Sequence, residues 1–121
     1  MLLGLRTVIY KVNDLAKAKK WFAEALGISP YFDQPYYVGF NVGGFELGLD
    51  PDSKNISYGN NVQAYWGVKE IEKEMSRLMS LGAVKNTDIQ DVGEGIKVAT
   101  VKDPFGNVFG IIQNPNFKFE R

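Results

Sequence analysis

The stretch LRTVIYKVNDLAKAKKWFAEALG (residues 5–27) contains the signals for the first strand and the first helix of the fold. Its first part, Leu5 to Val12, is rich in β-branched and aromatic residues, as strands are. Asn13-Asp14 then favours the start of a helix, because a short polar side chain there accepts a hydrogen bond from the first turn. Apolar residues follow at helical spacing until Gly27, a common helix terminator. The stretch predicts a strand that runs directly into a helix.

The stretch VQAYWGVKEIEKEMSRLMSLG (residues 62–82) repeats this pattern. Equivalent residues stand 56 positions apart, in the pairs Tyr10 and Trp66, Val12 and Val68, and Leu15 and Ile71. Further along, Phe45-Glu46-Leu47 corresponds to Phe109-Gly110-Ile111 at a separation of 64 positions. A repeat of this length indicates duplicated units that pack on each other.

Three short β-prone runs, separated by turn residues, follow each predicted helix. In the first half they are Tyr31 to Phe32, Tyr36 to Val42 and Phe45 to Leu49, and in the second half Val84 to Ile89, Ile96 to Val101 and Asn107 to Ile112. The order is therefore βαβββ twice, and the predicted fold class is α+β. We expect one domain over 1–121 that consists of an N-terminal module (1–50), a polar linker (51–61) and a C-terminal module (62–115).

The composition excludes several kinds of partner. Lys plus Arg number 14, as do Asp plus Glu, so no net charge attracts nucleic acid or an anionic membrane surface. The chain has no cysteine, which fits a reducing compartment. Its first residues do not have the pattern of a signal peptide, and no run approaches the roughly 20 apolar residues of a membrane span. We therefore expect a cytoplasmic protein that binds neither nucleic acid nor membranes.

Strand alternation predicts which side chains face a ligand pocket. Successive residues of a strand point to opposite faces, and the helices should cover the more apolar face. This rule places Val8, Tyr10 and Val12 under the first helix and gives the opposite, concave face to the pocket. The predicted pocket residues are Thr7, Ile9, Lys11, Tyr37, Phe40, Glu46, Gly48, Gln63, Tyr65, Val108, Gly110 and Ile112.

Tyr37 and Phe40 belong to an aromatic cluster that also contains Tyr31, Phe32 and Tyr36. Such a cluster has three interpretations: it lines the mouth of a ligand site, it forms a dimer interface, or it is core. The sequence leaves these alternatives open.

Three motifs resemble a known family. They are Val12-Asn13-Asp14-Leu15 leading through the helix to Leu26-Gly27, the run Gly-Val-Lys-Glu-Ile at 67–71, and Asp103-Pro104-Phe105-Gly106-Asn107 before the last strand. In these motifs the chain resembles the vicinal oxygen chelate superfamily, which includes glyoxalase, extradiol dioxygenases, fosfomycin-resistance enzymes and bleomycin-binding proteins. The resemblance implies two βαβββ modules that form a cupped, incomplete mixed β-barrel with the helices outside, usually in a homodimer.

The resemblance also implies four metal-ligand positions, which read Thr7, Gln63, Glu46 and Gly110 in this chain. Glu46 and Gln63 are weak candidates for metal ligands, because a threonine hydroxyl binds metal poorly and glycine has no side chain. We therefore expect no metal and no other cofactor, with a divalent metal as the alternative.

Glu46 has three interpretations: a metal ligand, a catalytic general base, or a rim carboxylate paired with Lys11. The resulting function is a small-molecule-binding protein of the bleomycin-resistance kind that works without the family metal. The alternative is a metal-dependent or Glu46-based lyase, isomerase or dioxygenase, so the sequence leaves open whether the chain is an enzyme. A third possibility is a partner domain whose pocket is vestigial.

Overall fold

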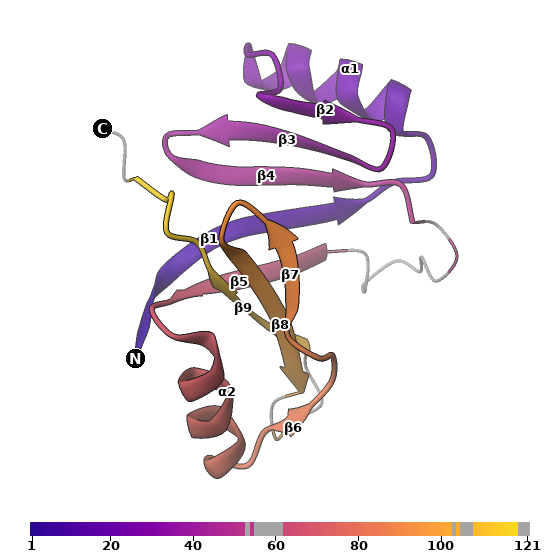
Figure 1. Cartoon of the computed structure of the whole chain (residues 1–121). Coiled ribbons are helices and arrows are strands. Elements are labelled where there is room, and N and C mark those ends of the chain that lie inside the picture. Colours follow the sequence, from indigo (N-terminus) through magenta and orange to yellow (C-terminus); the bar gives the residue numbers. More distant parts are fainter. Residues whose placement is uncertain (53, 55–61, 103, 105–107, 119–121) are drawn as a thin grey trace. The chain divides into compact units, whose positions relative to one another are not determined.

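The computed structural model describes residues 1–52, 54, 62–102, 104 and 108–118. It has two helices, α1 (Leu15–Leu26) and α2 (Ile71–Ser80) (Figure 1). The strands are β1 (Leu2–Lys11), β2 (Phe32–Gln34), β3 (Tyr37–Val42), β4 (Phe45–Asp50), β5 (Val62–Val68), β6 (Val84–Lys85), β7 (Gln90–Gly93), β8 (Ile96–Lys102) and β9 (Val108–Gln113). The α+β class and the repeated strand-helix-strands order are confirmed. Neither helix within these residues is long and apolar enough to span a membrane.

The second half has one strand more than the sequence predicts. The run expected as a single strand over Val84 to Ile89 ends at Lys85, and a separate strand, β7, begins at Gln90. Between them, the backbone N–H groups of Asn86 and Thr87 both donate to the Thr100 carbonyl, at 3.0 Å each. The Thr87 hydroxyl also accepts from the Thr100 N–H at 2.8 Å. Two donors on one acceptor interrupt the regular ladder, so the chain leaves the edge of β8 here and returns with β7.

Contacts divide the described chain into two compact units. The N-terminal unit covers Thr7–Gln63, and the C-terminal unit covers Met1–Arg6 and Ala64–Lys118. Residues 1–6 group with the later half because Leu2 packs against the C-terminal core, whereas β1 from Thr7 onward pairs with β4. The turn expected at Asp103-Pro104-Phe105-Gly106-Asn107 lies outside the described residues, apart from Pro104, as does most of the expected linker over 51–61.

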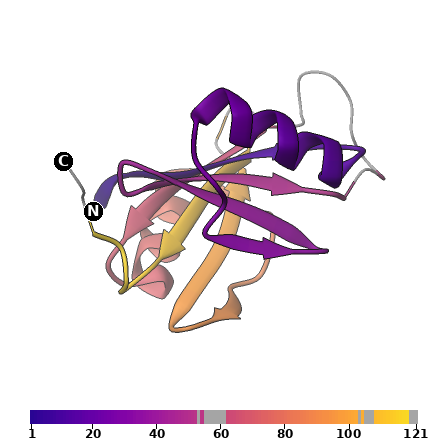
Figure 2. The same ribbon diagram turned by 90° about the horizontal axis from the view of Figure 1, so that it is seen from above.

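The N-terminal unit is a sheet in the order β2-β3-β4-β1 with α1 on one face (Figure 2). β1 runs parallel to β4, and the other neighbours are antiparallel. As predicted, α1 starts after Asp14, whose carboxylate accepts from the Lys17 N–H at 3.1 Å, and ends at Gly27, which has φ 71°. The core between helix and sheet is built on the fully buried Phe40 and Leu49.

The C-terminal unit repeats this arrangement with β5, β9, β8 and β6 in order, and β7 pairs with β8 as well. β5 and β9 are parallel, and α2 packs against β8 and β9. Glu70 precedes α2 without capping it through its side chain, and the first helical N–H, of Ile71, donates to Gln113 Oε1 of β9 at 2.9 Å instead. The helix is thereby fixed to the sheet at the point where Ile71 enters the core.

Candidate functional site

The strand register of the N-terminal unit shows which residues share a sheet face. Thr7 is the register partner of Glu46, Ile9 of Gly48 and Lys11 of Asp50. Residues that are partners on neighbouring strands lie on the same face. The alternate residues Tyr10, Leu47 and Leu49 pack in the core beneath α1. The predicted assignment of Thr7, Ile9, Lys11, Glu46 and Gly48 to the face away from α1 is confirmed, and we call it the open face of this unit.

The aromatic cluster divides between the two faces. Gly39 is the partner of Gly48, so its alternate neighbour Tyr37 lies on the open face, as predicted. Phe40 is the partner of Leu47 and is completely buried in the core beneath α1. The expectation that Phe40 lines the pocket is wrong, because strand alternation sends it to the opposite side of β3 from Tyr37.

Glu46 is bound by two tyrosine hydroxyls. Tyr31 Oη donates to Glu46 Oε1, and Tyr37 Oη donates to Glu46 Oε2 at 2.5 Å. The ion pairs within the described ranges do not include one between Glu46 and Lys11. The expected pairing of Glu46 with Lys11 is therefore wrong, and the partners of Glu46 are the two tyrosines. Tyr31 was absent from the predicted pocket residues. It precedes β2, and its position depends on a backbone hydrogen bond from its N–H to the Gly39 carbonyl at 3.0 Å.

Two facing glycines make room for the tyrosine rings. A Cβ atom on Gly48 would lie 1.9 Å from Tyr37 Oη, so Tyr37 lies directly across this residue. A Cβ atom on Gly39 would lie 3.2 Å from Tyr31 Cε1 and 3.3 Å from Glu46 Oε1. The bare backbone of β3 and β4 is therefore a floor that leaves room for both rings, whose hydroxyls reach the same carboxylate. Phe32 borders this floor, with its ring centroid 6.2 Å from that of Tyr37.

The open face of the C-terminal unit has an aromatic side chain but no carboxylate at the equivalent position. Tyr65 is the register partner of Gly110, and Gly67 of Ile112. A Cβ atom on Gly110 would lie 2.6 Å from the Ala64 carbonyl oxygen and 2.7 Å from Tyr65 Cδ1. The Tyr65 ring therefore fills the space that a side chain at 110 would need. Strand alternation adds Val108, which is half exposed, to the same face.

The remaining predicted residues are Thr7, which is 6% exposed, and Gln63, which is half-buried at the second position of β5. Thr7 and Glu46 lie side by side in the register. That positions 7, 46, 63 and 110 line one common cavity stays a prediction.

The donor atoms at the four positions do not fit the metal ion of the family resemblance. Gly110 supplies no side chain, and its surroundings leave no room for one. Each oxygen of Glu46 already accepts a hydrogen bond from a phenol. The chain has no histidine or cysteine, and its described part contains no group of three or more acidic side chains that could hold an ion.

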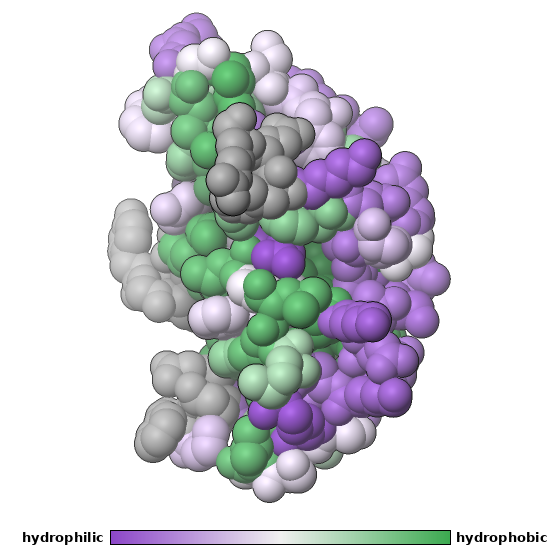
Figure 3. Space-filling view, turned by 90° about the vertical axis from the view of Figure 1, so that its left-hand side faces the viewer, coloured by the Kyte–Doolittle hydropathy of each residue, from purple (hydrophilic) through white to green (hydrophobic). Residues whose placement is uncertain are grey.

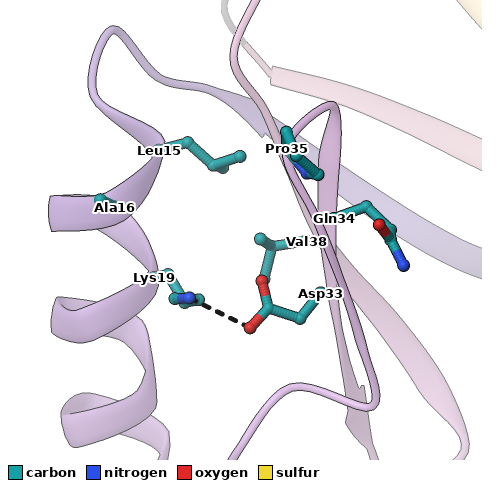
Figure 4. A pocket seen from close by; sticks show the side chains of 7 residues that line it. All are labelled: Leu15, Ala16, Lys19, Asp33, Gln34, Pro35 and Val38. Atoms are coloured by element: carbon teal, nitrogen blue, oxygen red, sulfur yellow. Dashed lines mark hydrogen bonds and ion pairs between the residues drawn. The ribbon is translucent and has the colours of Figure 1, made fainter.

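A separate hollow of about 400 Å³ lies between α1 and the β2–β3 hairpin (Figure 4). Leu15 and Ala16 line it from the helix, and Pro35 and Val38 line it from the hairpin. Lys19 reaches across it to form an ion pair with Asp33 at 3.0 Å. Asp33 and Val38 are register partners, so the hollow lies on the helix side of the sheet. It contains none of the predicted pocket residues.

Large apolar side chains remain exposed in both units. In the C-terminal unit they include Leu3 and Leu5 of β1, which are 58% and 46% exposed, and in the N-terminal unit Val42 and Phe45 beside the β3–β4 turn. Hydrophobic residues are visible beside hydrophilic ones on the surface drawn in Figure 3. Exposed apolar groups of this kind are where a protein partner or a ligand gains most from contact.

Comparison with known structures gives the same fold. A glyoxalase/bleomycin resistance protein/dioxygenase superfamily member from Vibrio splendidus is 20% identical, with a TM-score of 0.69, and the match covers 91% of this chain and 99% of that chain. Methylmalonyl-CoA epimerase from Mycobacterium tuberculosis is 17% identical, with a TM-score of 0.71 and coverage of 93% and 88%. The epimerase from Streptomyces coelicolor is 10% identical, with a TM-score of 0.78 and coverage of 95% and 99%.

At these identities the structural matches show the fold alone, and comparison with curated proteins gives no match. The family is shown by the sequence itself, because a family model matches residues 4–111, nearly the whole chain. The chain belongs to the Glyoxalase/Bleomycin resistance protein/Dioxygenase superfamily.

Proposed function

We propose that the chain is a small-molecule-binding protein, that its ligand lies on the open face of the N-terminal unit, and that it works without the metal ion of its family. The observation that carries this proposal is the convergence of two tyrosine hydroxyls on the single carboxylate of Glu46. The two hydroxyls come from separate segments, and their rings lie over the paired Gly39 and Gly48. Two glycines facing each other in a sheet weaken it, so their presence favours a role for the space that they leave.

The open face supplies the groups that a ligand site needs. Small-molecule sites are lined mainly by apolar and aromatic groups, with a few fixed polar atoms that orient the ligand. Tyr31, Tyr37 and Phe32 offer ring surface, and Ile9 offers apolar surface beside Gly48. A carboxylate has about four acceptor positions, and the two phenols use two of them. Glu46 can therefore still accept hydrogen bonds from N–H or O–H groups of a planar, partly apolar ligand.

The metal-free part of the proposal rests on the donor set. Metal sites need several deprotonated ligands at short distances, usually from imidazole, thiolate or carboxylate groups. Here the four positions provide one carboxylate, one amide, one hydroxyl and a glycine. This set supports the binding of organic ligands better than the binding of a transition metal.

Titration against a panel of planar aromatic compounds, followed by the fluorescence of Trp and Tyr, tests the binding function. We expect saturable binding of at least one compound, and Glu46→Gln should weaken it about tenfold to a hundredfold, because a hydrogen bond to a charged group contributes about 1.5–3 kcal/mol. Tyr36→Phe is the matched control. It also removes one tyrosine hydroxyl, but no hydrogen bond joins Tyr36 to Glu46 within the described residues. The absence of a saturable signal across the panel would contradict the proposal.

A second candidate function is proton transfer by Glu46 at a carbon next to a carbonyl group. The Streptomyces coelicolor epimerase structures include variants at a glutamate and at a glutamine whose numbers differ by 17, and Glu46 and Gln63 are 17 positions apart in this chain. This equal spacing supports equivalent places in the fold. A positioned carboxylate that exchanges a proton with carbon typically contributes about 100-fold or more to the rate.

Proton exchange in D₂O tests the second candidate. If Glu46 is the base, methylmalonyl-CoA incubated with the protein should incorporate deuterium at its α-carbon, as seen by ¹H NMR, and Glu46→Gln should slow this incorporation about 100-fold. Exchange at the same rate with Glu46→Gln would exclude Glu46 as the base. Saturable binding without any exchange would exclude proton transfer and support binding as the only function.

We also propose the homodimer that the family resemblance implies, because the exposed Leu3 and Leu5 offer apolar contact area. Light scattering measures the mass in solution directly. A monomer at all concentrations would contradict this part.

A further inference from the structure

We infer that Arg6 is an anion-binding residue on the open face of the C-terminal unit and that this face binds a small molecule with a carboxylate group. This inference goes beyond the proposed function, because it adds a binding site on the C-terminal unit and gives the chemical class of its ligand. Three features point to it: the path of the Arg6 side chain, the groups that hold it, and the absence of an acidic partner among the described residues.

The side chain of Arg6 lies across Gly67. A Cβ atom on Gly67 would lie 2.7 Å from Arg6 Nε and 2.9 Å from Arg6 Cζ. On β5, Gly67 alternates with Tyr65 and therefore shares its face, and its register partner is Ile112. Arg6 thus reaches the face of the C-terminal unit for which the sequence predicts ligand contact, although Arg6 itself was not among the predicted residues.

Two further groups fix the guanidinium. Its Cζ lies 3.9 Å from the centroid of the Phe117 ring, within the range of a cation–π contact. The guanidinium also lies beside Gly4 of β1, where a Cβ atom would be 3.2 Å from Arg6 Nη1. Gly4 has φ 133°, a conformation that side chains disfavour. The guanidinium therefore lies in a cradle formed by two glycines and one aromatic ring.

Among the residues that the structure describes, no acidic side chain pairs with Arg6. Within the described residues, the hydrogen bond of the Arg6 side chain is from Nη1 to the Leu5 carbonyl, at a long 3.3 Å, and no carboxylate lies within ion-pair distance. A guanidinium has five N–H donors in a fixed plane, so most of them remain available. Arg77 differs in this respect, because its Nε donates to Glu74.

An ordered guanidinium with free donors is suited to a planar anion. The fork of N–H groups matches the two oxygens of a carboxylate, and the resulting pair of hydrogen bonds is both stronger and more directional than a contact from lysine. Arg6 is also partly withdrawn from water. A partly desolvated charge without a counter-ion is unfavourable, so a bound carboxylate would supply the counter-ion that the described residues do not.

Titration of ¹⁵N-labelled protein with benzoate, with benzamide as the neutral probe of the same shape, tests this inference. Benzoate should shift the Arg6 Nε–H signal and the Gly67 and Tyr65 amide signals in a saturable way, and it should bind about tenfold or more tightly than benzamide. Arg6→Met should remove this preference, whereas Arg6→Lys, which keeps the charge but not the fork, should retain part of it. Lys20→Met is the matched control, since it removes one exposed positive charge from α1 and should change nothing.

The outcomes separate the inference from the proposed function. Equal affinity for benzoate and benzamide, or an unchanged benzoate affinity in Arg6→Met, overturns the role of Arg6 while ligand binding stands. A failure of both probes, together with a failure of the aromatic panel, contradicts the proposed function itself. The dispersion of the amide spectrum shows in each case that the variant is folded.

Discussion

The two units build their open faces from the same elements and place different chemistry on them. In the N-terminal unit, Tyr37 lies over Gly48 and its hydroxyl reaches the carboxylate of Glu46. In the C-terminal unit, Tyr65 lies over Gly110, the position that corresponds to Glu46, and no side chain remains there to bind. A glycine under a tyrosine ring therefore has two uses in this fold. It can bring a hydroxyl to a functional group, or it can replace that group with a ring.

Gly110→Ala tests the packing of Tyr65 over Gly110 in the C-terminal unit and should have the largest effect on stability. The added methyl group would meet the Ala64 carbonyl oxygen at 2.6 Å, and a backbone atom cannot move aside cheaply. Overpacking of this kind costs about 2 to 3 kcal/mol, so the free energy of unfolding in urea should fall by that amount. Unchanged stability would show that the Tyr65–Gly110 contact is loose, and it would contradict the claim that the Tyr65 ring takes the place of a side chain at position 110.

Gly48→Ala tests the polar half and should cost less. Its methyl group would meet the Tyr37 hydroxyl, the far end of a side chain that can turn away. The expected loss is about 1.5 kcal/mol, the lower end for a hydrogen bond to a charged group such as Glu46. A double-mutant cycle makes the cause visible: Tyr37→Phe should have little further effect in the Gly48→Ala background, because the same bond is already lost. Full additivity of the two changes would show that Gly48 does not position Tyr37.

The ends of the first helix and the sheet faces of most strand residues can be predicted from the sequence, because they depend on local signals. The Asp14 cap and the Gly27 terminator fix both ends of α1, and strand alternation correctly assigns Thr7, Glu46 and Gly48 to one face. Phe40 was placed wrongly because it was grouped with its aromatic neighbours, whereas the alternation of its own strand decides its side. Local period is a better guide than residue type in such a cluster.

The contacts that complete each face depend on pairings far apart in the chain. Tyr31 reaches Glu46 because Gly39 and Gly48 are register partners, and no local pattern reveals which glycines will face each other. The same holds for Arg6, which crosses to Gly67 on another strand. A hydrogen bond between Thr87 and Thr100 likewise splits an expected strand. Which glycines face each other becomes visible only when the strand register is known, and these facing glycines then mark where aromatic side chains can lie.

Tyr37→Phe alone measures the polar contact without changing the backbone. Removing the hydroxyl leaves one Glu46 oxygen without this donor, so the free energy of unfolding in urea should fall by about 1.5 kcal/mol. Tyr36→Phe should cost less than about 0.5 kcal/mol, the usual size for a surface change away from such a contact. Equal effects of the two variants would mean that the Tyr37 hydroxyl contributes no more than an exposed one.

The smallest effect concerns a second carboxylate, Glu74 of α2, whose partners are charged. Burial by itself raises the pKa of Glu74, but hydrogen bonds and charge from the Met1 ammonium, 2.7 Å away, and from Arg77 outweigh it, so the pKa lies below the ordinary 4.5. A carboxyl whose pKa is lower in the folded state stabilises the fold at pH values above its unfolded pKa, and this contribution disappears as the pH falls through the lowered value. The Met1 ammonium is 88% exposed and the Arg77 side chain 38%, so solvent limits the contribution to about 1 kcal/mol or less. Glu74→Gln should therefore lower the free energy of unfolding at pH 7 and flatten its fall below pH 4.5. An acid-unfolding profile parallel to that of the wild type would show that the charge of Glu74, unlike the geometry around Glu46, contributes nothing to the unit that contains it.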